Sequence, residues 1–374
     1  MSELSLPPGR VFLTGATGQV GRRVLLECAR QRRPVTVMLR RPETQLPRLL
    51  SWLAEQGAPK PDVQAVMGDL LVPDLGWGSL AVAREAVPAW AADVVAVVHA
   101  AAVWGWRLDP HQAEQANVQA SLALWRQSMQ WPRMRRFVMI VGYMSQHQDH
   151  MAKLGLDLIQ RPAAQDVDWA GVVRSSGVYE ASKLRAYWLM REESLQRRRP
   201  LTVIHPATVI GDEDAPEVPA TSAIGQLLAQ LAAGQMPLVP GSGEHRVPLV
   251  SVGYVAGYVT ALLDSPSKEL FDEHLLLDPA TPDLLSVTRA LAKGLQVRAP
   301  FGRIPLPWVR AASRWSALAG ALGLEPESLG FIVKGSFDVS REVTWAQGRG
   351  LTHPDVMQSL SHTAAAWRRS GADN

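Results

Sequence analysis

The sequence predicts an α/β fold, in which helices wrap a parallel sheet and a smaller, mostly helical part follows. Two observations lead to this prediction. Short apolar, β-rich runs alternate with helix-like patterns over the first two thirds of the 374 residues, which is typical of parallel strands joined by helices. Beyond about Gly211, proline and glycine divide the chain into short segments, so the alternation is expected to stop there.

The apolar runs predict the strands in chain order, at residues 10–14, 34–39, 63–67, 93–98, 136–141 and 201–205. The patterns between them predict helices at 18–31, 79–89, 111–131 and 178–197. In the first helix, Val20, Val24 and Cys28 recur every four residues and form one stripe against the sheet. Short helices are expected later, at 221–234, 251–263 and 283–293.

This order of elements predicts two domains. Residues 1–210 form the first, with a long lid loop near 143–176 whose length is typical of a substrate gate. Residues 211–374 form a cap, of which about 245–265 return to the first domain. Thirteen tryptophans are unusual usage; most are expected in the core and some along an apolar pocket, the candidates being Trp104, Trp106, Trp169, Trp188, Trp308 and Trp315.

Composition excludes several classes of protein. With 47% hydrophobic and 20% charged residues, the chain is neither disordered nor fibrous. A net charge of +3 is too small to indicate a nucleic-acid partner, and no apolar run is long enough for a membrane span. The single cysteine, Cys28, rules out an internal disulfide, no Cys/His cluster predicts a metal, and no secretory leader is visible. A cytoplasmic protein is expected.

A glycine-rich turn follows the first strand directly and opens the first helix. Its three glycines allow a tight turn, a close approach of the backbone to a pyrophosphate, and phosphate binding at the helix N-terminus. The strand–turn–helix context is the one that this motif requires, although a plain tight turn is the alternative. The sequence therefore predicts a Rossmann-type dinucleotide site that includes Gly15, Thr17, Gly18, Gln19, Val20 and Gly21.

The end of the second strand predicts which dinucleotide binds. The residue that reads the adenosine ribose lies about 20 residues beyond the glycines, where this chain has Arg40 and Arg41. A carboxylate there accepts from the ribose of NAD, whereas a guanidinium suits the extra 2′-phosphate of NADP. NADP(H) is therefore expected; ordinary surface arginines are the alternative.

Two further strand ends fit the same cofactor. Asp69 and Leu70 follow the third strand, where the carboxylate is placed to accept from the adenine amino group. Small residues follow the fourth strand and leave room for the nicotinamide ribose and the phosphates, namely Ala100, Ala101 and Ala102. Each segment alone is a weak signal, but their order on successive strands strengthens both.

Together these motifs, which cover about residues 10–260, resemble the extended short-chain dehydrogenase/reductase family. The matching features are Thr14-Gly15-x-x-Gly18-x-x-Gly21, Gly68-Asp69-Leu70, His99-Ala100-Ala101, Tyr179-x-x-x-Lys183 and His205-Pro206-x-x-Val209-x-Gly211. The finer match is to the branch of fatty-acyl and thioester reductases and hydroxysteroid dehydrogenases. The resemblance implies a doubly wound sheet with a substrate cap, a small-molecule substrate, and cofactor contacts from Pro206 and Val209. Family members often pair through helices such as 111–131 and 178–197, which leaves a homodimer open.

Tyr179 and Lys183 are the candidate catalytic pair. Residues four apart share a helix face, so the ammonium is expected to lower the pKa of a phenol that normally titrates near ~10. The resemblance implies that Tyr179 transfers the substrate's proton, and that Lys183 lowers the pKa of Tyr179 and binds the nicotinamide ribose. Without the glycine turn upstream, a plain surface pair would be the better interpretation.

One position departs from the family pattern. The family usually has Ser or Thr at the end of the fifth strand, where this chain has Val141 and Gly142. Ser145 can take the place of that Ser or Thr hydroxyl only if the loop shifts the register by about one turn. Otherwise Tyr179 alone polarises the substrate carbonyl, or the protein is an inefficient catalyst. Asn117 resembles a family asparagine, with a helix-cap or packing role as the alternative.

Three smaller features remain open. His147-x-x-His150 has no third metal ligand at a matching spacing, so a polar lid is predicted there rather than a metal site. Arg246 is a candidate for an anionic group or a surface residue. Gly253 stands where the family often has an aspartate.

The favoured prediction is an NADP(H)-dependent oxidoreductase that acts on a carbonyl or alcohol of a bulky, apolar substrate. A nucleotide-sugar epimerase or dehydratase is the first alternative, which Arg40 and Arg41 and the apolar cap oppose. A redox-sensing protein that binds the cofactor without turnover is the second, which the missing strand-five hydroxyl supports and the Tyr179/Lys183 pair opposes.

Overall fold

The alternating segments of the sequence form a parallel sheet with helices on both sides. The computed structural model describes residues 8–58, 60–78, 87–105, 108–265, 269–312 and 326–372. Within these ranges the main sheet has seven strands in the order β11-β6-β5-β4-β1-β2-β3. The strands are β1 (Arg10–Thr14), β2 (Val35–Leu39), β3 (Val63–Met67), β4 (Val94–His99), β5 (Arg136–Ile140), β6 (Leu201–Pro206) and β11 (Phe271–Leu276). The fold class is the one that the sequence predicts.

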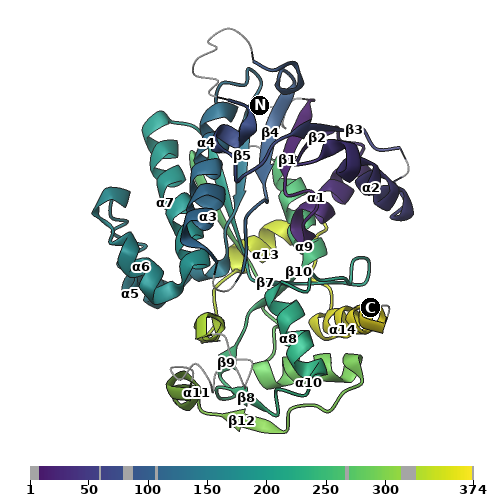
Figure 1. Cartoon of the computed structure of the whole chain (residues 1–374), viewed down its shortest axis with the longest axis vertical. Helices are drawn as coiled ribbons and strands as arrows, with labels where there is room; N and C mark the ends of the chain where they lie inside the picture. Colours follow the sequence, from purple (N-terminus) through teal and green to yellow (C-terminus); the bar gives the residue numbers. More distant parts are fainter. Residues whose placement is uncertain are drawn as a thin grey trace. The chain divides into compact units, whose positions relative to one another are not determined.

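Helices connect these strands and cover the sheet. Figure 1 shows α3, α4 and α7 on one side of it and α1 and α2 on the other. The helices of this part are α1 (Gln19–Arg30), α2 (Pro42–Glu55), α3 (Pro110–Ala113), α4 (Ala120–Ser128), α5 (Gln148–Lys153), α6 (Trp169–Ser176), α7 (Val178–Arg197) and α9 (Val252–Leu263). A π-helix, Glu114–Gln119, joins α3 to α4.

The predicted strands are confirmed to within a residue, but other elements were missed. Helix α2 has a proline, Pro47, in its interior, and β11 has charged side chains at Asp272 and Glu273; both features hide the expected periodicity. The lid loop predicted near 143–176 contains α5 and α6. Most of the helix predicted at 79–89 lies outside the described residues; only Ala89–Ala91 forms a 3₁₀ turn there.

The chain divides into two compact units. The first comprises residues up to Val141, Gln148–His205 and Ala256–His274. The second comprises Gly142–His147, Pro206–Val255 and the residues from Leu275 onward. The domain boundary expected near residue 210 stays a prediction.

Where the structure describes it, the second unit combines helices with three two-stranded sheets, β7/β10, β8/β12 and β9/β13. Its strands are β7 (Thr208–Ile210), β8 (Leu238–Pro240), β9 (His245–Arg246), β10 (Leu249–Ser251), β12 (Gly302–Ile304) and β13 (Val333–Lys334). Its helices are α8 (Ala223–Ala232), α10 (Leu284–Leu295), α11 (Leu306–Ala312), α13 (Ser340–Gln347) and α14 (Val356–Ala372).

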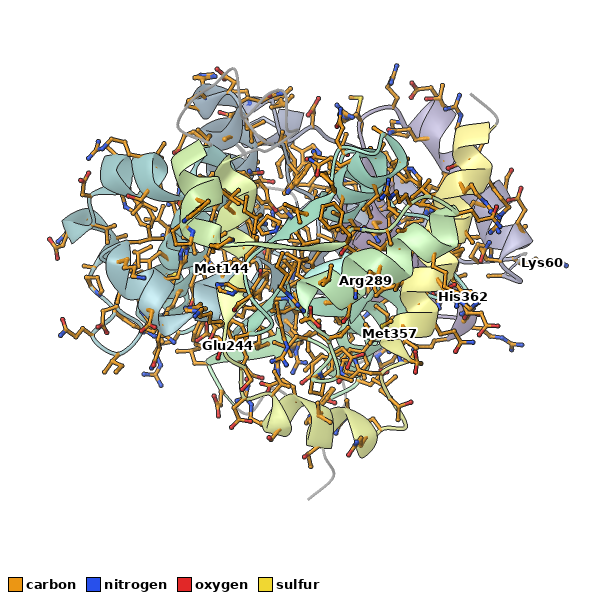
Figure 2. The ribbon with its side chains drawn as sticks, turned by 90° about the horizontal axis from the view of Figure 1, so that it is seen from below. Lys60, Met144, Glu244, Arg289, Met357 and His362 are labelled. Carbon is orange, nitrogen blue, oxygen red and sulfur yellow. The ribbon has the colours of Figure 1, made fainter. Side chains whose placement is uncertain are left out.

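Helices α10 and α14 pack closely within this unit. Figure 2 labels Arg289 on α10, and Met357 and His362 on α14. The close approach depends on Gly294, because a Cβ atom there would lie 2.6 Å from the Cβ of Ala364. No helix in the described part of the chain combines the length and the apolar character that a bilayer span requires.

Three tryptophans of the first unit are fully buried core residues, and Trp77, Trp90 and Trp169 are partly buried against the same core. Trp125, Trp131 and Trp188 are buried, and Trp125 packs edge-on against Phe137 of β5 at 5.2 Å between ring centroids. Trp308 is instead 70% exposed. Trp106 and Trp315 lie outside the described residues.

A partly buried polar cluster connects β11 to α7. The Glu273 carboxylate accepts from the hydroxyl of Tyr187 at 2.6 Å, forms an ion pair with Arg161 at 2.7 Å, and lies within hydrogen-bond distance of His205 Nε2, at 3.2 Å. Burial alone would raise the pKa of Glu273, but the His205 hydrogen bond and charge, the Tyr187 hydrogen bond and the Arg161 charge hold it well below its usual range. The carboxylate is therefore charged and stabilises the fold.

Glu273→Gln is expected to lower the free energy of unfolding at neutral pH by about 2 kcal/mol, because it weakens several charged hydrogen bonds in a partly buried site. An unfolded glutamate titrates near ~4.3. The pKa of Glu273 is lower in the folded state than in the unfolded state. The charge of Glu273 therefore stabilises the fold fully above pH ~4.3, and this stabilisation is lost as the pH falls below that value towards the folded pKa. Urea denaturation at pH 7 and below pH 4 measures it, with exposed Glu55→Gln as control. An equal difference at both pH values would contradict the charge's role.

Candidate cofactor and active site

The predicted cofactor residues follow adjacent strands at one edge of the sheet. Strands β3, β2, β1 and β4 are consecutive neighbours and run parallel. Gly15, Arg40, Asp69 and Ala100 follow their carboxyl ends directly or within two residues. The strand order reverses between β1 and β4, since β2 and β3 follow on one side of β1 and β4, β5 and β6 on the other. Open α/β sheets bind their ligands at such a reversal.

The glycine turn has the form of a phosphate cradle. Gly15 has φ +76°, and a Cβ there would lie 2.7 Å from the Ala101 nitrogen. Gly21 lets the first turn of α1 pack directly against the glycine turn. A Cβ atom at position 21 would lie only 2.1 Å from the Gly15 oxygen. Gly18 caps α1 without a side-chain hydrogen bond, and the buried Nε2 of Gln19 has no hydrogen-bond partner within the described ranges. These open donors at a helix N-terminus fit the diphosphate of a dinucleotide.

Gly21→Ala is expected to lower the free energy of unfolding by about 1–3 kcal/mol, because its methyl group would meet fixed backbone rather than a flexible side chain. It should also weaken NADPH binding, since the turn must move. Thermal unfolding and fluorescence titration with NADPH measure the two effects. Gly348→Ala is the control, because its nearest neighbour would lie at an ordinary 3.6 Å. Unchanged NADPH affinity in Gly21→Ala would contradict the assignment of this turn.

The residues expected to select the cofactor are accessible. Arg40 and Arg41 are exposed at the end of β2, and neither guanidinium forms an ion pair with any described residue. The Asp69 carboxylate accepts from the Leu71 nitrogen at 3.0 Å, and Leu70 beside it is half-buried. Ala100 and Ala101 are half-buried, and Ala102 is exposed.

A chain of hydrogen bonds joins the ends of β1 and β4. The Ala101 nitrogen donates to Thr14 Oγ1 at 3.2 Å, and Thr14 Oγ1 lies 2.8 Å from His99 Nδ1. His99 Nε2 lies 2.8 Å from Ser121 Oγ, which donates to the Asn117 carbonyl. Because Ser121 uses its proton on that carbonyl, it accepts from His99 Nε2–H, so His99 Nδ1 accepts from Thr14. Burial and Lys183 lower the pKa of His99 to about 3, so the ring is neutral.

Asn117 connects the segment after β4 to α7. Its Oδ1 accepts from the Val103 nitrogen at 2.8 Å, and its Nδ2 donates to the Val103 oxygen at 3.0 Å. The same Nδ2 donates to Ser182 Oγ at 2.9 Å, and Ser182 donates to the Tyr179 carbonyl. Asn117 lies in the π-helix, a geometry frequent at functional sites. The Asn117 side chain therefore bonds to Val103 and Ser182 rather than capping a helix, and the role that the family resemblance implies for it stays a prediction.

Tyr179 and Lys183 occupy the first two turns of α7. Gly177, with φ +83°, lets α7 follow α6 directly. The Tyr179 ring packs edge-on against Trp104, with 6.0 Å between ring centroids. The Lys183 ammonium donates to the Ile140 carbonyl at the end of β5, at 2.7 Å. Both residues therefore lie beside the carboxyl edge of the sheet.

The electrostatics of this pair differ from the sequence prediction. Burial raises the pKa of Tyr179, and the Glu180 carboxylate raises it further, whereas the sequence predicted a lowering by Lys183. Burial also lowers the pKa of Lys183 to about 8. The prediction was wrong for this structure because the ammonium is directed to Ile140, and because desolvation outweighs a charge one turn away.

Three further residues that the sequence predicts for the site, Ser145, Pro206 and Val209, belong to the second unit. Ser145 is buried in a 3₁₀ turn, Tyr143–Gln146, and donates to the Gly142 carbonyl at 2.6 Å. Pro206 ends β6, and Val209 lies in β7. The roles of these three residues stay predictions. Arg246 is half-buried in β9, and Gly253 donates its N–H to Asp212 at 2.8 Å.

Sequence reasoning missed one contact of the catalytic helix. His150, considered only as half of a metal motif, lies on α5 with its Nε2 2.6 Å from Glu180 Oε1. The signal was the glutamate directly after Tyr179. Among the described residues, no group of three or more His, Cys, Asp and Glu side chains could hold a metal ion.

Solved structures share this fold over nearly the whole chain. The terminal R domain from the myxalamid PKS-NRPS biosynthetic pathway is 20% identical, with a TM-score of 0.72 over 98% of this chain and 93% of that one. The reductase (R) domain of a nonribosomal peptide synthetase from Mycobacterium tuberculosis is 17% identical, with a TM-score of 0.67 over 99% and 94%. A UDP-galactose 4-epimerase is 14% identical, with a TM-score of 0.56 over 97% and 99%.

Sequence comparison identifies the family. No curated protein matches the chain. An NAD-binding family model described as male sterility protein matches residues 13–259, which is more than half of the chain and includes the glycine turn, the strand ends and the Tyr179/Lys183 pair. The chain therefore belongs to this NAD-binding family and is an extended short-chain dehydrogenase/reductase, as its motifs indicated.

Proposed function

We propose that the chain is an NADP(H)-dependent reductase that transfers a hydride between the nicotinamide and a carbonyl or alcohol carbon of a bulky, apolar substrate. The observation that carries the proposal is the position of Tyr179. Its ring contacts Trp104, which follows the Ala100–Ala102 segment, and Asn117 connects the same segment to α7. The candidate proton donor thus lies beside the cofactor edge of the sheet.

The chain's own residues have distinct roles in this proposal. NADPH, when bound, supplies the hydride. The glycine turn and Gln19 bind its diphosphate, Arg40 and Arg41 its 2′-phosphate, and Asp69 its adenine. Tyr179 gives a proton to the carbonyl oxygen, and Lys183 binds the nicotinamide ribose. Pro206 and Val209 complete the cofactor contacts, and Ser145 supplies the hydroxyl missing from Val141 and Gly142.

The branch of the family that the motifs resemble supports a proposal for the substrate class. Two of the similar structures are reductase domains of peptide-synthetase pathways, and the branch also includes fatty-acyl reductases. We therefore place an acyl thioester or a long-chain aldehyde first, with a sterol ketone as the other bulky carbonyl.

NADPH consumption tests this proposal. The purified protein is assayed by absorbance at 340 nm with acyl thioesters, long-chain aldehydes and sterol ketones. Consumption with one of these classes is the expected result. A sugar product formed from a nucleotide sugar while NADPH stays constant would indicate an epimerase instead.

A second candidate is a cofactor-binding protein without turnover. Two observations favour it: Val141 and Gly142 offer no hydroxyl at the end of β5, and burial raises the pKa of Tyr179 rather than lowering it. NADPH binding with no consumption across the whole panel would support this candidate over the reductase.

A further inference from the structure

Arg246 is a half-buried arginine whose charge is not neutralised by the protein. It lies in β9, and its guanidinium forms no hydrogen bond or ion pair with the residues that the structure describes. Its Nε is completely buried. Because a charged group loses hydration when it leaves water, arginine is rarely buried unless a partner compensates the loss. A guanidinium in this position therefore suits an anionic group that a ligand brings.

The other arginines of the second unit are placed differently. Wherever the structure describes them, they are exposed. Arg303 forms an ion pair with Asp283 at 2.8 Å, and Arg341 forms one with Glu342 at 2.8 Å. Within the described ranges of this unit, Arg246 is thus the arginine that is both withdrawn from water and unpaired.

The carboxylate two residues before Arg246 is engaged elsewhere. Glu244 forms an ion pair with Lys334 of β13 at 3.3 Å. Strand β13 runs antiparallel to β9, with Val333 opposite Arg246 and Lys334 opposite His245. The pair between Glu244 and Lys334 therefore leaves the positive charge of Arg246 for another group.

The turn before β9 fixes where Arg246 lies. Gly241 has φ +106°, a conformation that favours glycine. The Ser242 nitrogen donates to Nδ1 of the buried His245 at 2.9 Å. Because this turn is held by its own hydrogen bond and by pairing with β13, the backbone that carries Arg246 is positioned before any ligand binds.

Strand β13 also connects Arg246 to the turn that contains Ser145. Phe331 precedes Val333 by two residues, and its carbonyl accepts from the Tyr143 hydroxyl at 2.7 Å. The rings of Phe331 and Tyr143 lie 6.2 Å apart between centroids. Tyr143 opens the 3₁₀ turn of Ser145, the candidate hydroxyl for the substrate carbonyl. The second unit therefore carries Arg246 and Ser145 on segments that β13 joins.

We propose that Arg246 binds a phosphate group of the substrate, and that this substrate is an acyl thioester on a phosphopantetheine arm. A guanidinium offers a planar pair of N–H donors that matches phosphate oxygens. Of the substrate classes proposed above, the thioester is the one whose carrier, coenzyme A or a protein-bound phosphopantetheine, has a phosphate away from the reacting carbonyl. This inference rests on the proposed function, because it names the substrate class of the same site.

The contribution of Arg246 is limited to the thioester. In the reaction, the carbonyl carbon gains the hydride of NADPH, the C–S bond breaks with its electron pair on sulfur, and the thiol leaves with one proton. The product is an aldehyde and has no phosphate. Arg246 should therefore affect binding of the thioester and not of the matching aldehyde.

Calorimetric titration with two ligands that differ by one phosphate tests the inference. The ligands are the decyl thioethers of pantetheine and of pantetheine 4′-phosphate, which the protein cannot reduce. Saturating NADP⁺ keeps Arg40 and Arg41 from capturing the phosphate. The phosphate should strengthen binding by roughly 20-fold, as charge-assisted hydrogen bonds do. Arg246→Gln should abolish this difference, and Arg246→Lys should keep part of it, because the charge remains.

Arg298→Gln is the matched control. Arg298 is an exposed arginine of the same unit, so its replacement changes the net charge equally and should leave both affinities unchanged. The melting temperature supplies a second readout. Arg246→Gln should not lower it, since the substitution removes a half-buried charge that no described residue compensates.

Steady-state kinetics separate the two sources of the phosphate. Decanoyl-coenzyme A, decanoyl-pantetheine 4′-phosphate and decanal are compared as substrates. Arg246→Gln should raise KM for both thioesters by roughly 20-fold, with kcat within a few-fold, and should leave decanal unaffected. A lower wild-type KM for the coenzyme A thioester indicates coenzyme A as the carrier, whereas equal values indicate a protein-bound arm.

Three results would overturn the inference. They are equal wild-type affinities for the two thioethers, a phosphate effect that Arg246→Gln retains, and binding of UDP-glucose that depends on Arg246 while binding of the phosphorylated thioether does not. Because the titration needs no turnover, absence of NADPH consumption would contradict the proposed function separately, and the titration would still decide whether Arg246 binds phosphate.

Discussion

Tyr179→Phe is expected to lower NADPH-dependent turnover by roughly 1000-fold while NADPH affinity stays nearly unchanged. The substitution removes only the hydroxyl, which the proposed reaction needs for proton transfer. The ring remains, so its edge-on contact with Trp104 is retained and the segment after β4 keeps its support. Steady-state kcat on the best substrate and a fluorescence titration with NADPH measure the two quantities.

A matched control makes this result specific. Tyr258 is also buried, and its hydroxyl bonds to His274 Nδ1 at 3.0 Å, so Tyr258→Phe deletes a comparable hydroxyl elsewhere. It should reduce stability by about 1 kcal/mol and leave kcat intact. If Tyr179→Phe retained the wild-type kcat, or if both variants lost activity equally, Tyr179 would not be the proton donor.

Arg40→Glu combined with Arg41→Glu is expected to lower NADPH affinity by roughly 100-fold and to leave NADH affinity within a few-fold of the wild type. Charge-assisted hydrogen bonds to a phosphate contribute about 1.5–3 kcal/mol each, and both guanidiniums are exposed at the end of β2. The loss should be confined to NADPH because only that cofactor carries a 2′-phosphate. Titration with each cofactor measures the ratio of affinities.

Arg48→Glu separates a specific contact from a change in net charge. Arg48 is exposed on α2 of the same unit, so its reversal alters the overall field without removing the predicted contact. It should change NADPH affinity only slightly at 0.15 M salt, where distant charges are screened. Equal losses for NADH and NADPH in the double variant would contradict the assignment of NADP(H).

The sheet could be predicted from the sequence because most of its strands are buried and apolar. All five residues of β2 are buried, so no polar alternation obscures the run. There is a physical reason why strand β11 was not predicted. Strand β11 contains Glu273, whose partners Arg161, Tyr187 and His205 come from distant parts of the chain, and such a cluster cannot be anticipated from local periodicity.

The candidate site likewise combines local motifs, which the sequence reveals, with long-range contacts, which it does not. The glycine turn and the Tyr179/Lys183 pair are local motifs, and the structure places both at the predicted elements. The hydrogen bonds of His99 join it to Thr14, 85 positions away, and to Ser121, 22 positions away. The contact between His150 and Glu180 spans 30 positions. Local sequence patterns do not reveal such contacts. The direction of the Tyr179 pKa shift depends on burial, which spacing along a helix does not reveal.

Transfer of deuterium from NADPH labelled at C4 of the nicotinamide tests the central claim most directly. The protein is incubated with labelled NADPH, with each label stereoisomer in turn, and the substrate that supports NADPH consumption, and the product is analysed by mass spectrometry. One isomer should deliver one deuterium to the former carbonyl carbon. Tight NADPH binding with no deuterium in any product would show that the chain binds the cofactor without using it as a reductant.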